Sequence, residues 1–215
     1  STYVATWVAQ PIVGHTAIYQ MSLVHWSASS FLQAVLVALL VTPLALVFRY
    51  LAKQASRKRR KDWTILCALP LAFMVLAGIV TFYPIFMGNG QVLAQALLSS
   101  QPIPYLPLTL AVKGLLVYLL LRNGAYGGTL TPSFALGIGS GYLVTMILSA
   151  VALHLDPALG MLLGATVFLG TTLQAPMTAI ALSLGFTGQS WALMLPLALS
   201  AGVSYMIQNR WENKR

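Results

Sequence analysis

Two glycines and a proline lie close together between two long apolar runs, in the stretch Gly127-Gly128-Thr129-Leu130-Thr131-Pro132. Pro132 suits the first turn of a helix, where the backbone needs no donor. The two glycines allow the chain to turn sharply and to bring its backbone close to another group. The N–H groups from about Thr129 onward then lack helical partners, at the positive end of a helix dipole. This arrangement is typical of an anion-binding site that uses no charged side chain.

A second interpretation of the same glycines is a close crossing of two helices, which also requires small residues. Local sequence leaves both alternatives open for residues 127–132. The three glycines that follow, at positions 137, 139 and 141, are spaced two residues apart. For these three we expect helix packing and not ligand binding.

The composition predicts the kind of element that positions this segment. Hydrophobic residues make up 58% of the 215 residues and charged residues only 7%, against roughly 25% charged in globular proteins. The mean hydropathy is +0.81. The apolar runs are long and do not alternate, which excludes a membrane β-barrel. We therefore predict an all-α polytopic membrane protein with tilted and broken helices.

Proline, glycine and capping residues divide the chain into predicted helices. Phe31–Ala52 is the clearest span, and Trp63–Met87 returns across the membrane, opened by Asp62 and interrupted at Pro70 and Pro84. The remaining predicted helices are Thr2–Leu23, Gln91–Leu98, Leu106–Leu121, Pro132–Gly141 with a continuation to His154, Leu159–Leu173, Pro176–Leu184 and Trp191–Ile207. Two of them, Leu159–Leu173 and Pro176–Leu184, are too short to cross a bilayer upright. Residues 1–209 are thus predicted to form a membrane domain and residues 210–215 a polar tail.

The net charge of +9 comes from clusters of basic residues. One cluster occupies the predicted loop 53–61, and the other closes the chain. Because basic loops of membrane proteins face the cytoplasm, both clusters are predicted to be cytoplasmic, beside anionic lipids. This interpretation is favoured over nucleic-acid binding. The expected location is the inner membrane of a bacterial cell.

Other residues that could do chemistry are few. Lys113 lies within an apolar span, where it is either functional or a snorkelling lysine, and the sequence does not decide between the two. The only acids are Asp62, Asp156 and Glu212, and all three lie in predicted loops or in the tail. This leaves no pair for acid–base catalysis, so no enzyme is predicted. The single cysteine, Cys67, allows no intrachain disulfide.

The histidines are scattered, and none has a second histidine three or four positions away. They are His15, His25 and His154. Histidines that form a metal site on a helix face usually recur at that spacing. No metal site and no cofactor is therefore predicted.

Three segments carry a resemblance to a known family. The segment 124–137 resembles the glycine-glycine-x-phenylalanine-x-proline motif of the voltage-gated chloride channel (ClC) family. Leu173–Ile180 is similar to the family's later arginine-alanine-proline-leucine-threonine segment, and Gly88-Asn89-Gly90 is similar to its upstream glycine triplet. The resemblance implies the second of two inverted halves. It also implies an anion held at the α-helix N-terminus by backbone amides, with these site residues: Gly127, Gly128, Thr129, Leu130 and Thr131.

The chain also departs from the family pattern. Leu130 replaces the usual phenylalanine, and Gly185 stands where many members have a glutamate. The family's gating glutamate and serine ligand belong to the first half, and its ligand tyrosine belongs to a later helix. By resemblance, the chain supplies about half of an anion pathway and has a missing N-terminal half as a partner. A homodimer is also expected, with Leu159–Leu173 and Trp191–Ile207 as candidate surfaces.

The predicted function is therefore transmembrane transport of chloride or a similar anion, as a channel or a proton-coupled exchanger. A transporter of another anion, such as fluoride or nitrate, would bind its anion by the same kind of site. A structural or assembly subunit that does not conduct is the alternative from another class.

Overall fold

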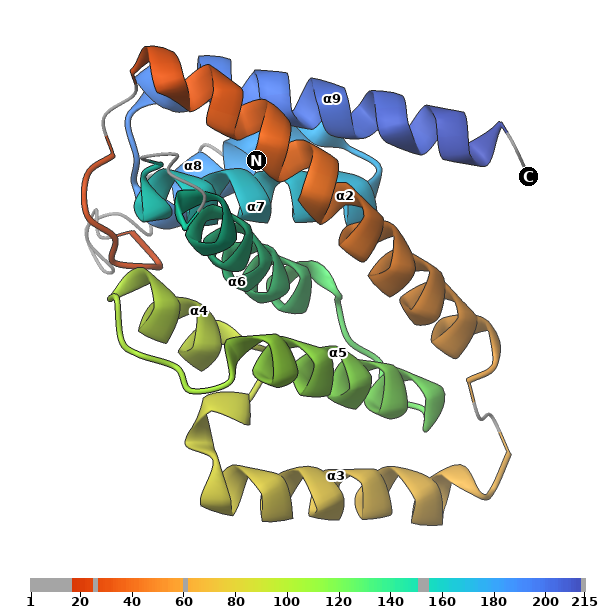
Figure 1. Cartoon of the computed structure of the whole chain (residues 1–215). Helices are drawn as coiled ribbons and strands as arrows, with labels where there is room; N and C mark the ends of the chain where they lie inside the picture. Colours follow the sequence, from red (N-terminus) through yellow and green to blue (C-terminus); the bar gives the residue numbers. More distant parts are fainter. Residues whose placement is uncertain (1–16, 25–26, 60–61, 151–154, 214–215) are drawn as a thin grey trace, which may run out of the picture.

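The computed structural model describes residues 17–24, 27–59, 62–150 and 155–213. Every regular element in these ranges is helical, as predicted. In chain order the elements are α2 (Ala28–Arg57), α3 (Ile65–Phe82), the 3-10 helix η1 (Pro84–Phe86), α4 (Gln91–Leu98), α5 (Leu106–Arg122), α6 (Leu130–Ser149), α7 (Pro157–Leu173), α8 (Pro176–Thr187), the 3-10 helix η2 (Trp191–Leu193) and α9 (Met194–Glu212) (Figure 1).

Helices α6 and α7 cross at very short distance near the centre of the molecule (Figure 1). A Cβ atom at Gly137 would lie 2.7 Å from the Cα atom of Ala165. A Cβ atom at Gly141 would collide with the carbonyl oxygen of Gly160 and lie 2.9 Å from the Cα atom of Gly164. The obstacles are backbone atoms, which cannot rotate away. Only glycine fits at this crossing, so the prediction that these glycines serve packing is confirmed.

Gly139 lies on another side of α6 and faces α5. A Cβ atom there would collide with the side chain of Leu110. The three glycines spaced two residues apart thus let α6 pack closely against two different helices. This packing fixes the position of the α6 N-terminus.

Helix α7 is enclosed by its neighbours. Its residues from Leu159 to Thr171 are all buried, and it contacts α2, α6, α8 and α9. With 17 residues it is about 26 Å long, less than the roughly 30 Å of a hydrocarbon core. The predicted shortness is therefore confirmed. The prediction of a dimer surface on Leu159–Leu173 is wrong, because this helix is interior, whereas α9 exposes Leu195 and Met206.

Helix α2 begins with a capping box. Ser27 is the N-cap, and its backbone N–H donates to Ser30 Oγ over 2.9 Å. The 30 residues of the helix extend beyond the predicted span Phe31–Ala52 and continue through Pro43. At about 1.5 Å per residue the helix is roughly 45 Å long, so it must tilt or project from the bilayer.

The basic segment 53–61 is only partly a loop. Lys53 and Arg57 lie in the last turns of α2, which ends at Arg57. Basic side chains at a helix C-terminus interact favourably with its dipole, and this explains why the helix runs further than predicted. The prediction of a loop that begins at residue 53 is therefore wrong.

Helix α3 is shorter than the predicted span Trp63–Met87. Its N-cap is Thr64, without a side-chain cap, so the assignment of Asp62 as the cap is wrong. The helix continues through Pro70, which does not interrupt it, and ends before Pro84, which opens η1. None of its residues is buried.

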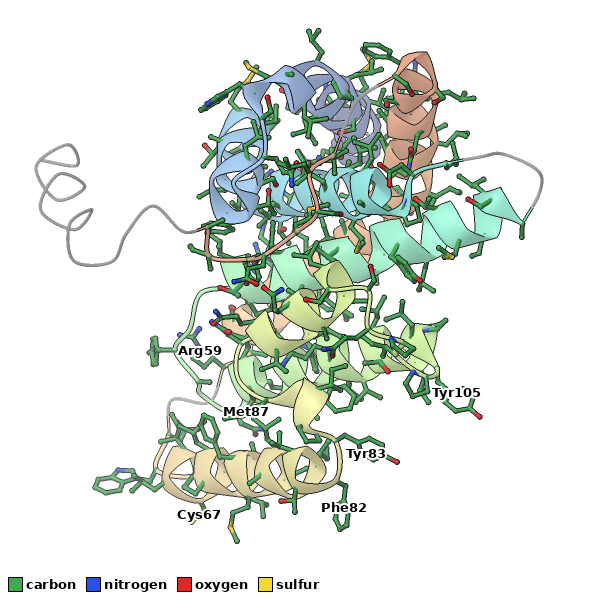
Figure 2. The ribbon with its side chains drawn as sticks, turned by 90° about the vertical axis from the view of Figure 1, so that its left-hand side faces the viewer. Arg59, Cys67, Phe82, Tyr83, Met87 and Tyr105 are labelled. Atoms are coloured by element: carbon green, nitrogen blue, oxygen red, sulfur yellow. The ribbon has the colours of Figure 1, made fainter. Side chains whose placement is uncertain are left out.

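The exposure of α3 follows from its place at the edge of the molecule. It contacts only α5 and η1 closely and lies apart from the other helices in Figure 1. Cys67 and Phe82 point from α3 away from the rest of the protein in Figure 2. An 18-residue apolar helix with this exposure is suited to contact with lipid.

The segment 17–24 contradicts the predicted helix Thr2–Leu23, because it contains no helical residue. The earlier part of that prediction lies outside the described residues. The backbone N–H of Tyr19 donates to the carbonyl oxygen of Phe186 over 2.9 Å. The segment is therefore anchored to α8 and does not form hydrogen bonds within a helix of its own.

Two glutamine side chains pair with the backbone of this segment. Gln95 accepts a hydrogen bond from the N–H of Gln20 and donates to its carbonyl oxygen, each over 3.0 Å. Gln189 likewise accepts from the N–H of Val24 and donates to the carbonyl oxygen of Ser22, each over 3.0 Å. Non-helical backbone inside a membrane protein requires such partners.

Candidate anion-binding site

The segment with the candidate residues connects α5 to α6. Helix α5 ends at Arg122, and Gly124 follows with a φ of +111°, which only glycine adopts readily. Helix α6 begins at Leu130, with Thr129 as its N-cap and no side-chain cap. Pro132 lies in the first turn, as predicted, although the helix begins two residues before it.

The first turn of α6 leaves backbone amides free. The first amide that donates along the helix is that of Ser133, to the carbonyl oxygen of Thr129 over 2.9 Å. Within the described residues, no carbonyl or side chain accepts a hydrogen bond from the N–H groups of Thr129, Leu130 and Thr131. Pro132 has no N–H group. Three adjacent donors thus remain available at the positive end of the helix dipole.

The two glycines before this turn border open space. A Cβ atom at Gly127 or Gly128 would meet no atom within 4 Å, and both residues are exposed. Neither has a positive φ, so the predicted sharp turn lies at Gly124 instead. The alternative of a close helix crossing at these glycines is therefore wrong for the described residues. An anion that binds to the free amides requires open space of this kind beside them.

A serine that the sequence interpretation missed lies in the same helical turn. Ser133 is fully buried, and its Oγ has no hydrogen-bond partner among the described residues. A buried hydroxyl without a protein partner is uncommon, and an ordered water or an ion can satisfy such a group. The only signal in the sequence was a polar residue directly after the proline of the motif.

Lys113 lies deep in the protein beside this turn. Its Nζ donates to the carbonyl oxygens of Phe86 over 2.9 Å and of Gly88 over 2.8 Å, and the residue is 2% exposed. A Cβ atom at Gly90 would lie 3.6 Å from Lys113 Cε and 3.8 Å from Pro132 Cα. Lys113 and the first turn of α6 are thus both neighbours of Gly90. The snorkelling alternative is wrong, because the ammonium group points inward.

Three aromatic rings hold the start of α6 in place. The ring centroids of Tyr19 and Phe134 lie 5.1 Å apart, and those of Phe134 and Phe186 lie 5.3 Å apart. Such ring pairs contribute about 0.5–1.5 kcal/mol each beyond their buried area. The cluster joins segment 17–24, α6 and α8, and so orients the turn that carries the free amides.

The basic segment after α2 also reaches the loop. The guanidinium carbon of Arg59 lies 4.1 Å from the ring centroid of Tyr126, one residue before Gly127. Cation–π contacts of this kind contribute about 0.5–1 kcal/mol at exposed sites. A positive charge near the loop raises the local concentration of anions.

In the described structure, no hydrogen bond or ion pair joins any of the three acids to residues 127–131. Asp62 is exposed in the turn before α3, Asp156 Oδ1 accepts from the N–H of Ala158 and caps α7, and Glu212 pairs with Arg49 over 2.9 Å. In the described part of the chain, no three potential ligands gather around a metal position. The three histidines, His15, His25 and His154, lie outside the described residues.

Comparison with known proteins gives a matching family model and a solved structure with a similar fold. The family model described as voltage gated chloride channel matches residues 1–209. A solved structure of a CLC-type fluoride/proton antiporter matches with a TM-score of 0.76 and 20% sequence identity, over 95% of this chain. The chain spans 51% of the length of that protein, about half. The comparison with curated proteins gave no match.

Four helices of the described structure are long and apolar enough to cross a membrane. They are Ser29–Arg57, Ile65–Phe82, Leu130–Ser149 and Trp191–Glu212. Together with the matches, they make the chain an integral membrane protein with half of a CLC-type fold. From the family model, which covers nearly its whole length, the chain belongs to the voltage gated chloride channel family.

Proposed function

We propose that this chain supplies half of a transmembrane anion pathway and binds the anion at the first turn of α6. The observation that carries the proposal is the set of free amides at Thr129, Leu130 and Thr131. Gly127 and Gly128 complete the site by leaving open space beside those amides.

Free amides at a helix N-terminus suit a small anion that has lost part of its water shell. Each hydrogen bond to a charged group contributes about 1.5–3 kcal/mol, and the helix dipole adds to this. The contacts are made by the backbone, so Leu130 serves as well as the phenylalanine of the family motif. Family membership supports the same assignment.

The transported ion is chloride or fluoride. The matching family model has the description voltage gated chloride channel, and the structurally similar protein is a fluoride/proton antiporter. Asp156 and Glu212 are engaged elsewhere, and Asp62 is exposed in the turn before α3. If transport is coupled to protons, we propose that the missing first half supplies the proton carrier.

The proposal is tested by reconstituting the complete gene product in liposomes loaded with chloride or with fluoride. We expect efflux of at least one of the two ions, measured with an ion-selective electrode. We expect no efflux from loaded liposomes that contain no protein. Dependence on a potassium ionophore distinguishes electrogenic flux from electroneutral leak. Alkalinisation of the external buffer during anion efflux, as protons enter in exchange, distinguishes an exchanger from a channel. Protein-containing liposomes that release neither ion would instead favour a structural subunit.

We also propose that the C-terminal ends of α2 and α9 face the cytoplasm. The Arg49–Glu212 ion pair joins these two helices near their C-terminal ends, so Arg57 and Arg210 belong to the same side of the membrane. Basic residues near span ends select the cytoplasmic side. We expect a reporter fused after residue 215 to be active only in the cytoplasm. Activity on the opposite side would contradict this orientation.

The location in a bacterial inner membrane and the homodimer stay predictions. For the dimer, the outer face of α9 is the candidate surface that remains, because it exposes apolar side chains such as Leu195 and Met206. The division into a membrane domain (1–209) and a polar tail (210–215) also stays a prediction, and α9 itself runs on to Glu212.

A further inference from the structure

Lys113 is a buried cation for which the described structure provides no acidic partner. All three acids of the chain lie within the described residues, and the one ion pair among those residues joins Arg49 and Glu212. Among the described residues, the ammonium group of Lys113 donates hydrogen bonds to the carbonyl oxygens of Phe86 and Gly88. These bonds use two of its three N–H donors, and neutral carbonyl groups do not neutralise its charge.

A buried charge without a counter-ion is costly, and ionisable residues inside membrane proteins usually mark ion pathways. Hydrogen bonding alone does not require a lysine here, because an amide side chain could also donate to carbonyl oxygens. The feature that needs an explanation is therefore the positive charge itself. A small mobile anion would balance this charge without a fixed acid.

The position of Lys113 relates the charge to the α6 turn. Gly90 has a φ of +105° and lies between the lysine and the helix. Lys113 Cε and Pro132 Cα both lie within 4 Å of the Cβ position at Gly90. No side chain at Gly90 separates the two, and few solvent ions can screen a charge that is buried.

We infer that Lys113 is the fixed cation of the anion site. It acts through space on a small monovalent anion at the free amides of α6, and through its two carbonyl bonds it holds the turn at Gly88 against that helix. The inference rests on the proposed function, since it requires an anion at the first turn of α6. It adds a charged side chain to a site that the sequence predicts to use none.

The test measures the half-saturating concentration for chloride and for fluoride flux in liposomes that contain the complete gene product. We expect Lys113→Gln, which keeps a donor but loses the charge, to raise this concentration on the order of tenfold for the transported ion. Lys113→Arg keeps the charge and is expected to restore most of the affinity. Arg210→Gln removes an exposed charge from the end of α9 and serves as the control, with wild-type affinity expected.

A second pair of variants tests the charge without removing the lysine. Thr109 precedes Lys113 by one helical turn on α5 and is nearly buried. Thr109→Glu places a carboxylate beside the ammonium group, whereas Thr109→Gln is its neutral counterpart of the same size. We expect only Thr109→Glu to weaken anion affinity. This pair decides the question even if Lys113→Gln fails to fold.

The possible outcomes separate the two proposals. Absence of both chloride and fluoride flux in the wild-type protein would overturn the proposed function, and the inference with it. Wild-type flux with unchanged affinity in Lys113→Gln, or with equal affinity in Thr109→Glu and Thr109→Gln, would overturn the inference alone. Loss of affinity in Lys113→Arg as large as in Lys113→Gln would also overturn it, since the lysine would then act by shape.

Discussion

The Gly141→Val variant is expected to yield no stably folded protein. A Cβ atom at this position would collide with the carbonyl oxygen of Gly160 and lie 2.9 Å from the Cα atom of Gly164. Overpacking a core typically costs about 1–3 kcal/mol when side chains can adjust. Here the obstacles are backbone atoms of the central helix α7, so we expect a cost above this range. Because folded proteins are stable by only about 5–15 kcal/mol, such a loss is severe.

The measurement is the yield of monodisperse protein in size-exclusion chromatography, followed by a thermal melt of whatever is recovered. Gly78→Val is the matched control, because a Cβ atom at Gly78 on α3 would meet no atom within 4 Å. We expect the control to be purified and to melt like the wild-type protein. If Gly141→Val behaves like Gly78→Val, α6 and α7 do not cross as closely as described.

Local sequence signals explain several of the helix boundaries. The bounds of α4 and the start of α5 and α8 agree with the predictions, because glycine or proline residues bound these helices in the sequence. Asp156 caps α7 through its side chain, one residue before Pro157, where the sequence predicts a turn. Such signals act over one helical turn, so they can be interpreted without knowledge of the fold.

Segment 17–24 shows why other boundaries could not be predicted. Its residues are apolar enough for a helix, but Gln95 and Gln189 supply its backbone partners. These glutamines follow the segment by 75 and 165 residues. No window of local sequence contains both the segment and its partners, so the pattern predicts a helix that tertiary contacts replace.

The candidate site likewise has features that local sequence predicts and features that depend on distant residues. The free amides of α6 could be predicted, because they follow from Pro132 and the residues directly before it. The role of Lys113 could not, because its partners Phe86 and Gly88 lie 27 and 25 residues away. The two kinds of glycine also look alike in sequence. Only the structure shows that Gly141 touches backbone while Gly128 borders open space.

This contrast makes Gly128→Val the sharpest test of the α6 site. Position 128 has no positive φ, and a Cβ atom there would meet nothing within 4 Å, so valine is compatible with the fold. Its branched side chain would nevertheless fill the space beside the amide of Thr129, which the proposed anion must occupy. We therefore expect a folded protein whose anion flux is reduced at least tenfold, about 1.4 kcal/mol or more in transition-state free energy.

The measurement is ion-selective-electrode flux from liposomes, with Gly128→Ala as an intermediate step in size and Gly78→Val as the control for a valine in open space. Flux should fall in the order wild type, Gly128→Ala, Gly128→Val, while thermal melts stay similar in all four proteins. A graded loss of flux without loss of stability is the result that steric exclusion of the ion from the α6 turn predicts. Undiminished flux in Gly128→Val would mean that the ion crosses the membrane without touching these amides.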